Sequence, residues 1–156
     1  MKKWEFVGTL FYTGYFPVYP SILGGLWGVL FILFTGARIY WEIAVIFLLF
    51  CLGIISARER IYYTEHPDPP EIIIDEALGV MITLLFVERR VVFIIAGFFL
   101  FHLFDFLKPF PIKRIEKLKG GYGVILDDVV GGIYANIVLH FWVFLYFALS
   151  KGKFFS

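Results

Sequence analysis

Long apolar runs alternate with short polar breaks along most of the chain. Five apolar segments stand out, at residues 22–34, 39–55, 72–87, 91–107 and 124–149. A helix that spans a bilayer needs about 20 residues, and about 17 are tolerated. The second, fourth and fifth segments meet this length. The first and third are short enough to tilt, to lie partly at the interface or to sit inside a bundle. Segment length favours helices over strands.

The breaks between these segments have identifiable causes. Residues 66–71 read HPDPPE, and three prolines in so short a stretch indicate a loop. The run KPFP at 108–111 ends the fourth segment, because each proline removes a backbone donor and restricts the residue before it. The run GGYG at 120–123 predicts a flexible turn into the fifth helix. We therefore expect one all-α domain over residues 1–156.

Composition places this helical chain in a membrane. The chain is 60% hydrophobic and 17% charged, whereas ordinary soluble domains are about half apolar and about a quarter charged. A soluble fold of this size could not hide so much apolar surface, so we expect an integral membrane helical bundle of about five hydrophobic segments. The net charge of +1 gives no sign of nucleic-acid binding. The only cysteine, Cys51, cannot form an internal disulfide.

The positive charges give this bundle an orientation. If all five segments cross, the loops on one side carry more lysines and arginines than the loops on the other, and the richer side should be cytoplasmic. The N-terminus is then inside and the C-terminus outside. The residues expected on the richer side are Lys2, Lys3, Arg58, Arg60, Lys108, Lys113, Arg114, Lys117 and Lys119, and those on the other side are Arg38, Arg89, Arg90, Lys151 and Lys153.

Five carboxylates share one depth in this topology, near the cytoplasmic face. They are Asp75 and Glu76 at the start of the third segment, Asp105 near the end of the fourth, and Asp127 and Asp128 at the start of the fifth. Ionisable residues in apolar segments usually face a bundle interior or a watery cavity and tend to be functional. Clustered carboxylates repel one another unless a cation lies among them, and their hard oxygen atoms suit Mg²⁺.

Groups that could bind a phosphate are expected beside these carboxylates. Lys108 and His102 each lie one helical turn from Asp105. The backbone amides of Gly121 and Gly123, at the start of the next helix, would suit an anion. The combination predicts metal-assisted chemistry on a phosphate at the membrane surface, with a free carboxylate as the proton acceptor.

Simpler interpretations stand beside these. Asp127 and Asp128 could merely cap the last helix, and Lys108 could be an ordinary lysine that reaches the membrane interface. Adjacent helical residues point about 100° apart, so at most one member of each acidic pair should face a metal squarely; we slightly favour Glu76 and Asp127. The glycines near the pairs predict close helix packing; they are Gly79, Gly131 and Gly132.

Three motifs occur in a fixed order: IIIDEALGVMITL, FHLFDFLKPFPI and GGYGVILDDVVGG. Together they resemble the phosphatidylglycerophosphatase A family, and the similarity runs from about Gly14 to Asn136. The resemblance implies an all-α, Mg²⁺-dependent lipid phosphatase of the bacterial inner membrane with a cytoplasm-facing site. Its substrate would be phosphatidylglycerophosphate, hydrolysed to phosphatidylglycerol. By match to the motifs, the candidate site is Asp75, Glu76, Asp105, Lys108, Asp127 and Asp128.

Two stretches depart from the family pattern. The family usually has Arg three residues before the fourth-segment aspartate, where this chain has His102, which binds a phosphate well only when protonated. The family's N-terminal motif resembles Pro-Gly-Thr-x-Gly-Ser. Here the corresponding stretch is YPSILGGL, in which Ser21 and Ile22 do not match.

Other functions remain open from the sequence. A small ion or proton transporter could use the same acidic groups, although it would need carboxylates at several depths. A CDP-lipid-dependent phosphotransferase also uses aspartates and a metal, but its run of spaced aspartates is not found here. The expected partners are phosphatidylglycerophosphate and membrane lipids. The sequence leaves open the oligomeric state, the number of metals and the nucleophile, which could be water or an aspartate.

Overall fold

The computed structural model describes residues 2–17, 19–66 and 69–152, and within them the chain is helical without strands. The all-α prediction is therefore confirmed. Pro67 and Asp68 of the proline loop, and Lys153, lie outside the described residues. The elements are α1 (Lys2–Gly8), the short 3₁₀ helix η1 (Thr13–Tyr15), α2 (Pro20–Phe34), α3 (Ile39–Thr64), α4 (Ile74–Thr83), α5 (Val91–Leu107), α6 (Ile112–Ile115) and α7 (Gly121–Gly152).

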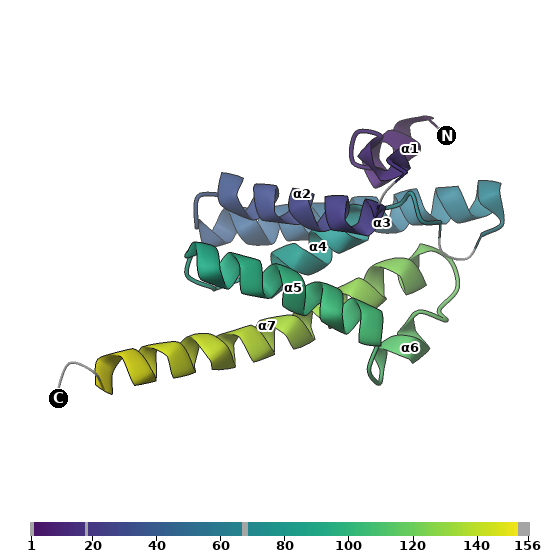
Figure 1. Cartoon of the computed structure of the whole chain (residues 1–156). Helices are drawn as coiled ribbons and strands as arrows, with labels where there is room; N and C mark the ends of the chain where they lie inside the picture. The colour runs from purple at the N-terminus through teal and green to yellow at the C-terminus, as the bar shows by residue number, and fades with distance from the viewer. Residues whose placement is uncertain (1, 18, 67–68, 153–156) are drawn as a thin grey trace.

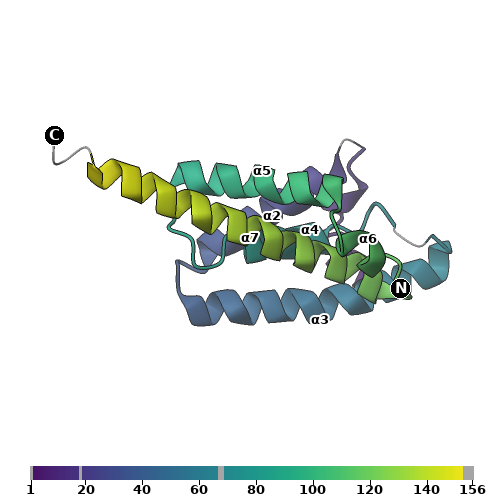
Figure 2. The same ribbon diagram turned by 90° about the horizontal axis from the view of Figure 1, so that it is seen from below.

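The long helices α2, α3, α5 and α7 run roughly along one direction, and the short α4 lies among them (Figures 1 and 2). Short connections make successive helices alternate in direction. α4 packs against all four of these helices. The N-terminal helix, α6 and the start of α7 gather at one end of the bundle, and the C-terminus lies at the other (Figure 1).

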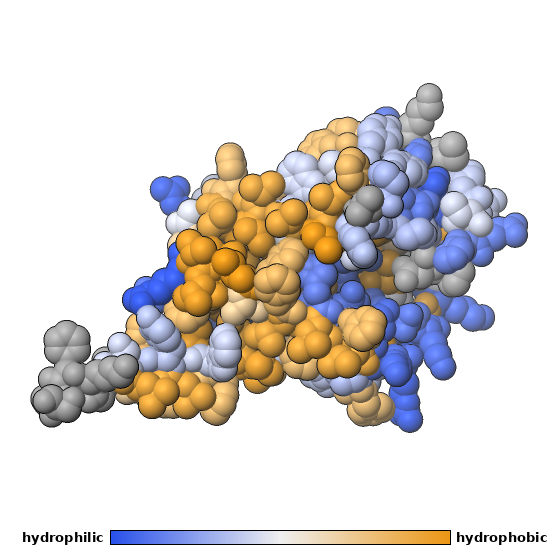
Figure 3. Space-filling model, in the orientation of Figure 1, coloured by the Kyte–Doolittle hydropathy of each residue, from blue (hydrophilic) through white to orange (hydrophobic). Residues whose placement is uncertain are grey.

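Two helices of the described chain, α3 and α7, are long and apolar enough to cross a membrane. α2 has 15 residues and α5 has 17, so fewer helices reach spanning length than the five hydrophobic segments predicted. In the apolar 18-residue stretch of each helix, only 22% of α3 and 17% of α7 is buried. A core helix of a soluble protein would be mostly buried, so these helices turn their apolar side chains outward. Figure 3 shows this apolar surface between polar ends.

The third predicted segment, residues 72–87, folds as a short helix inside the bundle. α4 spans only Ile74–Thr83, and eight of its ten residues are buried. Of the three arrangements considered for a short segment, the structure has the buried one. Such a helix cannot cross a bilayer, because ten residues rise only about 15 Å.

Polar side chains from neighbouring elements satisfy the C-terminal carbonyls of α4, which would otherwise be orphaned in apolar surroundings. The Asn136 side-chain amide of α7 donates to three carbonyl oxygens at 2.9–3.1 Å. Those oxygens belong to Ile82, Thr83 and Leu85. Arg89 donates to the Leu84 carbonyl at 2.8 Å and pairs with the buried Glu42 of α3. These contacts make a ten-residue helix tolerable in the core.

Glycines let α4 and α7 approach closely. A Cβ on Gly132 would lie 2.5 Å from the carbonyl oxygen of Gly79, and a Cβ on Gly79 would lie 3.0 Å from the carbonyl oxygen of Asp128 and 2.2 Å from the Phe101 ring of α5. Gly131 differs, because the nearest atom to its Cβ position is 3.9 Å away. The prediction of close packing is thus confirmed at Gly79 and Gly132 and is wrong for Gly131.

This difference between neighbours gives a matched test of the packing. Gly132→Ala should lower the free energy of unfolding by about 1–3 kcal/mol, because rigid backbone must move to admit the methyl group. Gly131→Ala should be neutral or slightly stabilising, since alanine favours helix over glycine. Thermal unfolding in detergent micelles, followed by circular dichroism, measures both variants. Equal destabilisation by the two substitutions would contradict the packing described here.

Candidate active site

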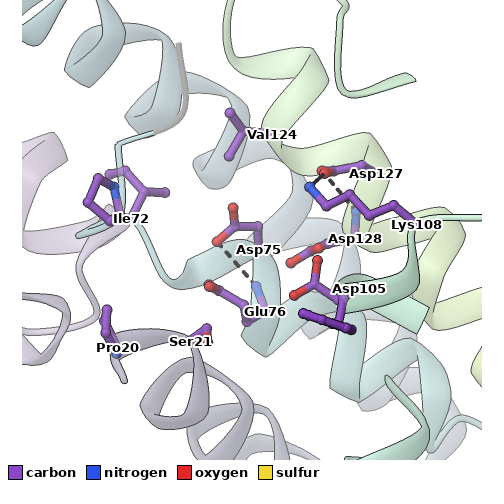
Figure 4. A pocket seen from close by; sticks show the side chains of 12 residues that line it. Pro20, Ser21, Ile72, Asp75, Glu76, Asp105, Lys108, Val124, Asp127 and Asp128 are labelled. Carbon is purple, nitrogen blue, oxygen red and sulfur yellow. Dashed lines mark hydrogen bonds and ion pairs between the residues drawn. The ribbon is translucent and has the colours of Figure 1, made fainter. Parts of the chain in front are cut away.

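A cavity of about 410 Å³ opens where α2 and α4 begin, where α5 ends and where α7 passes them. All the carboxylates predicted from the sequence line it, and so does Lys108 (Figure 4). The polar lining residues drawn there are Ser21, Asp75, Glu76, Asp105, Lys108, Asp127 and Asp128. Three segments that are far apart in the sequence therefore converge on one cavity, although the topology of five crossing segments from which this was predicted is not the observed one, because α4 is too short to cross.

The first acidic pair sits in the first turn of α4. The preceding isoleucines, Ile72 to Ile74, are buried and anchor this turn in the core. The Ile73 amide donates to the Gly8 carbonyl at 3.0 Å, which ties the turn to the N-terminal helix. Acidic side chains at a helix N-terminus interact favourably with its partial positive charge. Asp75 and Glu76 are thereby held at a fixed position on the cavity wall.

Lys108 ends α5 and turns back over the cavity. It is the C-cap residue, with a left-handed backbone (φ 40), and its amide donates to the Phe104 carbonyl at 2.9 Å. Pro109 follows and disfavours helical backbone for the residue before it. The Lys108 ammonium lies 2.9 Å from an Asp127 carboxylate oxygen and 3.2 Å from one of Glu116. Lys108 is therefore ion-paired across the cavity, and the interfacial-lysine interpretation is wrong.

The second aspartate pair lies inside α7 rather than at its start. The helix begins at Gly121, its first turn has no acidic residue, and both aspartates are buried. Asp127 is six residues into the helix, a rise of about 9 Å. The interpretation of Asp127 and Asp128 as helix caps is therefore wrong. The pair faces the cavity from within the bundle, as Figure 4 shows.

The GGYG run is mostly helix and does not line the cavity. Gly120 has φ 70, but Gly121 already belongs to α7, so the expected flexible turn is confined to the first glycine. A Cβ on Gly121 would lie 2.4 Å from the Ile54 carbonyl of α3. A Cβ on Gly123 would lie 2.6 Å from the Glu116 carbonyl. These glycines let α7 pack closely against α3 and the backbone at Glu116. Neither is among the residues lining the cavity.

Three of the carboxylates have the spacing of a metal site. Asp75, Glu76 and Asp128 each offer an oxygen, and these oxygens lie within 4.8 Å of one another. Asp127, which we favoured from the sequence over Asp128, is not in this group and bonds to Lys108 instead. The second oxygen of Glu76 is buried and has no hydrogen-bond partner among the described residues. Hard oxygen donors with an unsatisfied buried atom fit a Mg²⁺ ion.

Electrostatics also favour a cation here. One ammonium group, on Lys108, faces five carboxyl groups in the cavity lining. Burial, with a smaller contribution from the charges of Asp128 and Asp105, raises the pKa of Glu76 to about 8. Burial lowers the pKa of Lys108, but its hydrogen bonds to Asp127 and Glu116 and the charges of Asp127 and Asp105 together outweigh this and raise it overall, so the lysine stays charged. A divalent ion would remove the repulsion that disfavours the charged form of Glu76.

His102 lies beside the cavity rather than in its lining. Its Nδ1 is 2.9 Å from the Phe98 carbonyl and its Nε2 is 3.4 Å from the carbonyl of Ser21. A Cβ on Gly25 of α2 would lie 2.6 Å from the imidazole ring. The ring thus packs between α5 and α2 and contacts the cavity only through the backbone of Ser21, a residue that lines it. Sequence spacing alone could not distinguish this position from one that faces a phosphate.

The fold and the cavity define a small helical protein with outward-facing apolar helices and a buried acidic centre. The chain belongs to the phosphatidylglycerophosphatase A family, whose model matches residues 6–143.

Three relatives cover most of the chain. A Bacteroides thetaiotaomicron protein with the provisional name phosphatidylinositol-3-phosphatase is 35% identical over 85% of this chain and 89% of its own length. Phosphatidylglycerophosphatase A of Haemophilus influenzae is 35% identical over 79% of this chain and 77% of its own length. The Escherichia coli phosphatidylglycerophosphatase A is 28% identical over 90% of this chain and 83% of its own length. No solved structure matches the chain significantly.

The ligand spacing predicts which aspartate of the α7 pair matters for metal binding. Asp128→Asn should weaken binding of Mn²⁺, a spectroscopic substitute for Mg²⁺, by at least about tenfold, because it removes one charged donor. Asp127→Asn should weaken it less, since this residue is bonded to Lys108. Titration of each purified variant with Mn²⁺, followed by electron paramagnetic resonance, gives both affinities. A larger loss in the Asp127 variant would overturn the assignment.

Proposed function

We propose that this protein is a Mg²⁺-dependent lipid phosphatase that removes the terminal phosphate of phosphatidylglycerophosphate and leaves phosphatidylglycerol, a step of phospholipid synthesis. One observation carries the proposal: three ligand-spaced carboxylates and an ion-paired lysine share one cavity in a chain of this family. Two relatives bear the name of this activity. Bound Mg²⁺ would supply Lewis-acid stabilisation of the charge on the phosphate oxygens.

The residues of the cavity divide into separate roles under this proposal. Asp75, Glu76 and Asp128 would hold the ion. Lys108 would bind the phosphate, and its hydrogen bond to Asp127 orients it before the substrate arrives. Asp105 lines the same cavity outside the ligand-spaced group, so we assign it the proton of the attacking water. Water then forms a bond to phosphorus as Asp105 takes its proton, the ester P–O bond breaks, and Asp105 gives the proton to the leaving lipid alcohol.

The position of the cavity argues against the two rival functions. A transporter would need polar groups along a path through the bundle. The carboxylates instead gather in a single cavity where α4 begins and α5 ends. A CDP-lipid phosphotransferase has no support among the relatives, whose names describe phosphatases. A phosphate monoester is therefore the substrate class that fits best.

We further propose that the protein crosses the bacterial inner membrane several times with the cavity facing the cytoplasm. The end of α3, the short α6 and the start of α7 form the end of the bundle beside the cavity (Figure 1). Basic residues concentrate there, and basic loops favour the cytoplasmic side. They include Arg58, Arg60, Lys113, Arg114, Lys117 and Lys119.

Phosphate release from defined lipids tests the proposed activity. Purified protein with Mg²⁺ should release phosphate from phosphatidylglycerophosphate in mixed micelles and stop when EDTA is added. Phosphatidylinositol 3-phosphate belongs in the same assay, because one relative carries that name. Faster release from the inositol lipid would replace the proposed substrate and keep the phosphatase class. No metal-dependent release from either lipid by folded protein would reject the class.

Lys108 and His102 make a matched pair for phosphate binding, since both were candidates from the sequence. Lys108→Gln should lower kcat/KM by about a hundredfold or more, as loss of a group that stabilises transition-state charge does. His102→Gln should retain most activity, because His102 contacts backbone carbonyls rather than the cavity. Steady-state kinetics with the same lipid compare the two. A loss at His102 as large as that at Lys108 would show that the imidazole reaches the phosphate.

A further inference from the structure

An apolar groove of about 560 Å³ runs along the outer side of α5, where α7 flanks it. No charged side chain lines it. The lining residues are Val92, Ile95, Ala96, Phe99, Leu100 and Leu103 of α5 with Val138 and Trp142 of α7. Ala96 is the smallest of them, so it leaves space between the larger side chains on either side. Such a groove on a helix that faces lipid accepts a flexible hydrocarbon chain.

The groove and the carboxylate cavity come close to each other along α5. Phe106 lines the cavity and is 85% exposed. Leu103, the groove residue nearest the cavity along α5, lies three residues earlier and therefore on the same helix face. Two exposed apolar side chains, one turn apart on α5, thus lie between the cavity and the groove.

The length of the groove matches one leaflet. Leu103 and Val92 are eleven residues apart on α5, a rise of about 16 Å. The hydrocarbon core of a bilayer is about 30 Å thick, so one leaflet is about half of that. A lipid with its phosphate among the carboxylates would lay an acyl chain along the whole groove.

A second apolar groove near the cavity fits an acyl chain less well. It lies between α2 and residues 11–16, and it runs along α2 only from Leu23 to Leu30, a rise of about 10 Å. Thr13 is part of its other wall, and the Thr13 hydroxyl accepts a hydrogen bond from Trp27 at 3.0 Å. This groove is shorter and has a polar wall, so the groove on α5 is the better site.

We propose that the groove between α5 and α7 binds one acyl chain of the substrate lipid and sets the preference of the enzyme for chain length. This inference rests on the proposed lipid phosphatase activity. The cavity then binds the phosphate through charge, and the groove binds the acyl chain through apolar contact area. A chain too short to reach Phe99 and Ala96 gains little from the groove.

Filling the groove tests the proposal by kinetics. Ala96→Trp should lower the ratio of kcat/KM for a sixteen-carbon diacyl substrate to that for a six-carbon one by about tenfold, which is what loss of contact with about two methylenes costs. Ala44→Trp is the matched control, since Ala44 is exposed on α3 and lines none of the cavities described above. It should leave the ratio unchanged. An unchanged ratio in Ala96→Trp, or the same fall in both variants, would overturn the proposal.

A binding measurement tests the groove without turnover, so failure of the groove is distinguishable from failure of the enzymatic proposal. Trp142 lines the groove and Trp41 lies on α3 away from it, at similar exposures of 58% and 61%. Variants that keep one of these tryptophans are placed with EDTA in phosphatidylcholine vesicles containing a few per cent of phosphatidylglycerophosphate with brominated acyl chains. Bromine quenches tryptophan on contact.

Quenching of Trp142 should exceed that of Trp41 by at least about twofold, and brominated phosphatidylcholine at the same fraction should quench both alike. Equal quenching of the two tryptophans by the brominated substrate would overturn the groove whether or not the protein hydrolyses the lipid. Preferential quenching of Trp142 in a protein that releases no phosphate would keep the binding site and reject the activity.

Discussion

The structure depends on a ten-residue helix, α4, that is buried inside a bundle of longer apolar helices. A helix leaves four amides unpaired at its start and four carbonyls at its end, and neither set tolerates an apolar environment. At the end, Asn136 and Arg89 satisfy the carbonyls. At the start, the helix opens into the carboxylate cavity, where Asp75 and Glu76 lie at its positive pole. The cavity thus also gives the unpaired amides at the start of the buried helix α4 a polar environment.

The crowding of carboxyl groups in the cavity favours a cation there. Five carboxyl groups and one lysine cannot all be charged at close range without strong repulsion. The lysine, Lys108, forms its ion pair within the cavity with Asp127 of the α7 aspartate pair. The other member of the pair, Asp128, then remains with Asp75 and Glu76. An ion at those oxygens would be neutralised by ligands on two helices, α4 and α7. Because Gly79 and Gly132 let these helices approach closely, the packing glycines and the proposed ligands belong to one arrangement.

Features set by local chemistry could be predicted from the sequence, and features set by contacts between helices could not. Residues 91–107 were predicted as one apolar segment, and α5 has these bounds, because Pro109 ends it in any context. Convergence of the carboxylates followed from alternating helix direction. Gly121 and Gly123 were misjudged because they suit a turn as well as a tight helix contact, and only the nearby backbone of α3 and of Glu116 decides between the two. Which of Asp127 and Asp128 joins the ligand-spaced carboxylates likewise depends on a contact between helices, because the Lys108 side chain bonds to Asp127.

The two departures from the family pattern lie next to each other. His102 Nε2 is 3.4 Å from the carbonyl of Ser21, and Ser21 lines the rim of the cavity. A change at one position therefore alters the surroundings of the other, and the imidazole fills the space that Gly25 leaves open. In the proposed function the carboxylates and Lys108 would act on the phosphate, which glycerol and inositol lipids share. Under the proposed roles, discrimination between these headgroups would fall to other residues of the cavity lining, such as Ser21, which His102 contacts through its backbone.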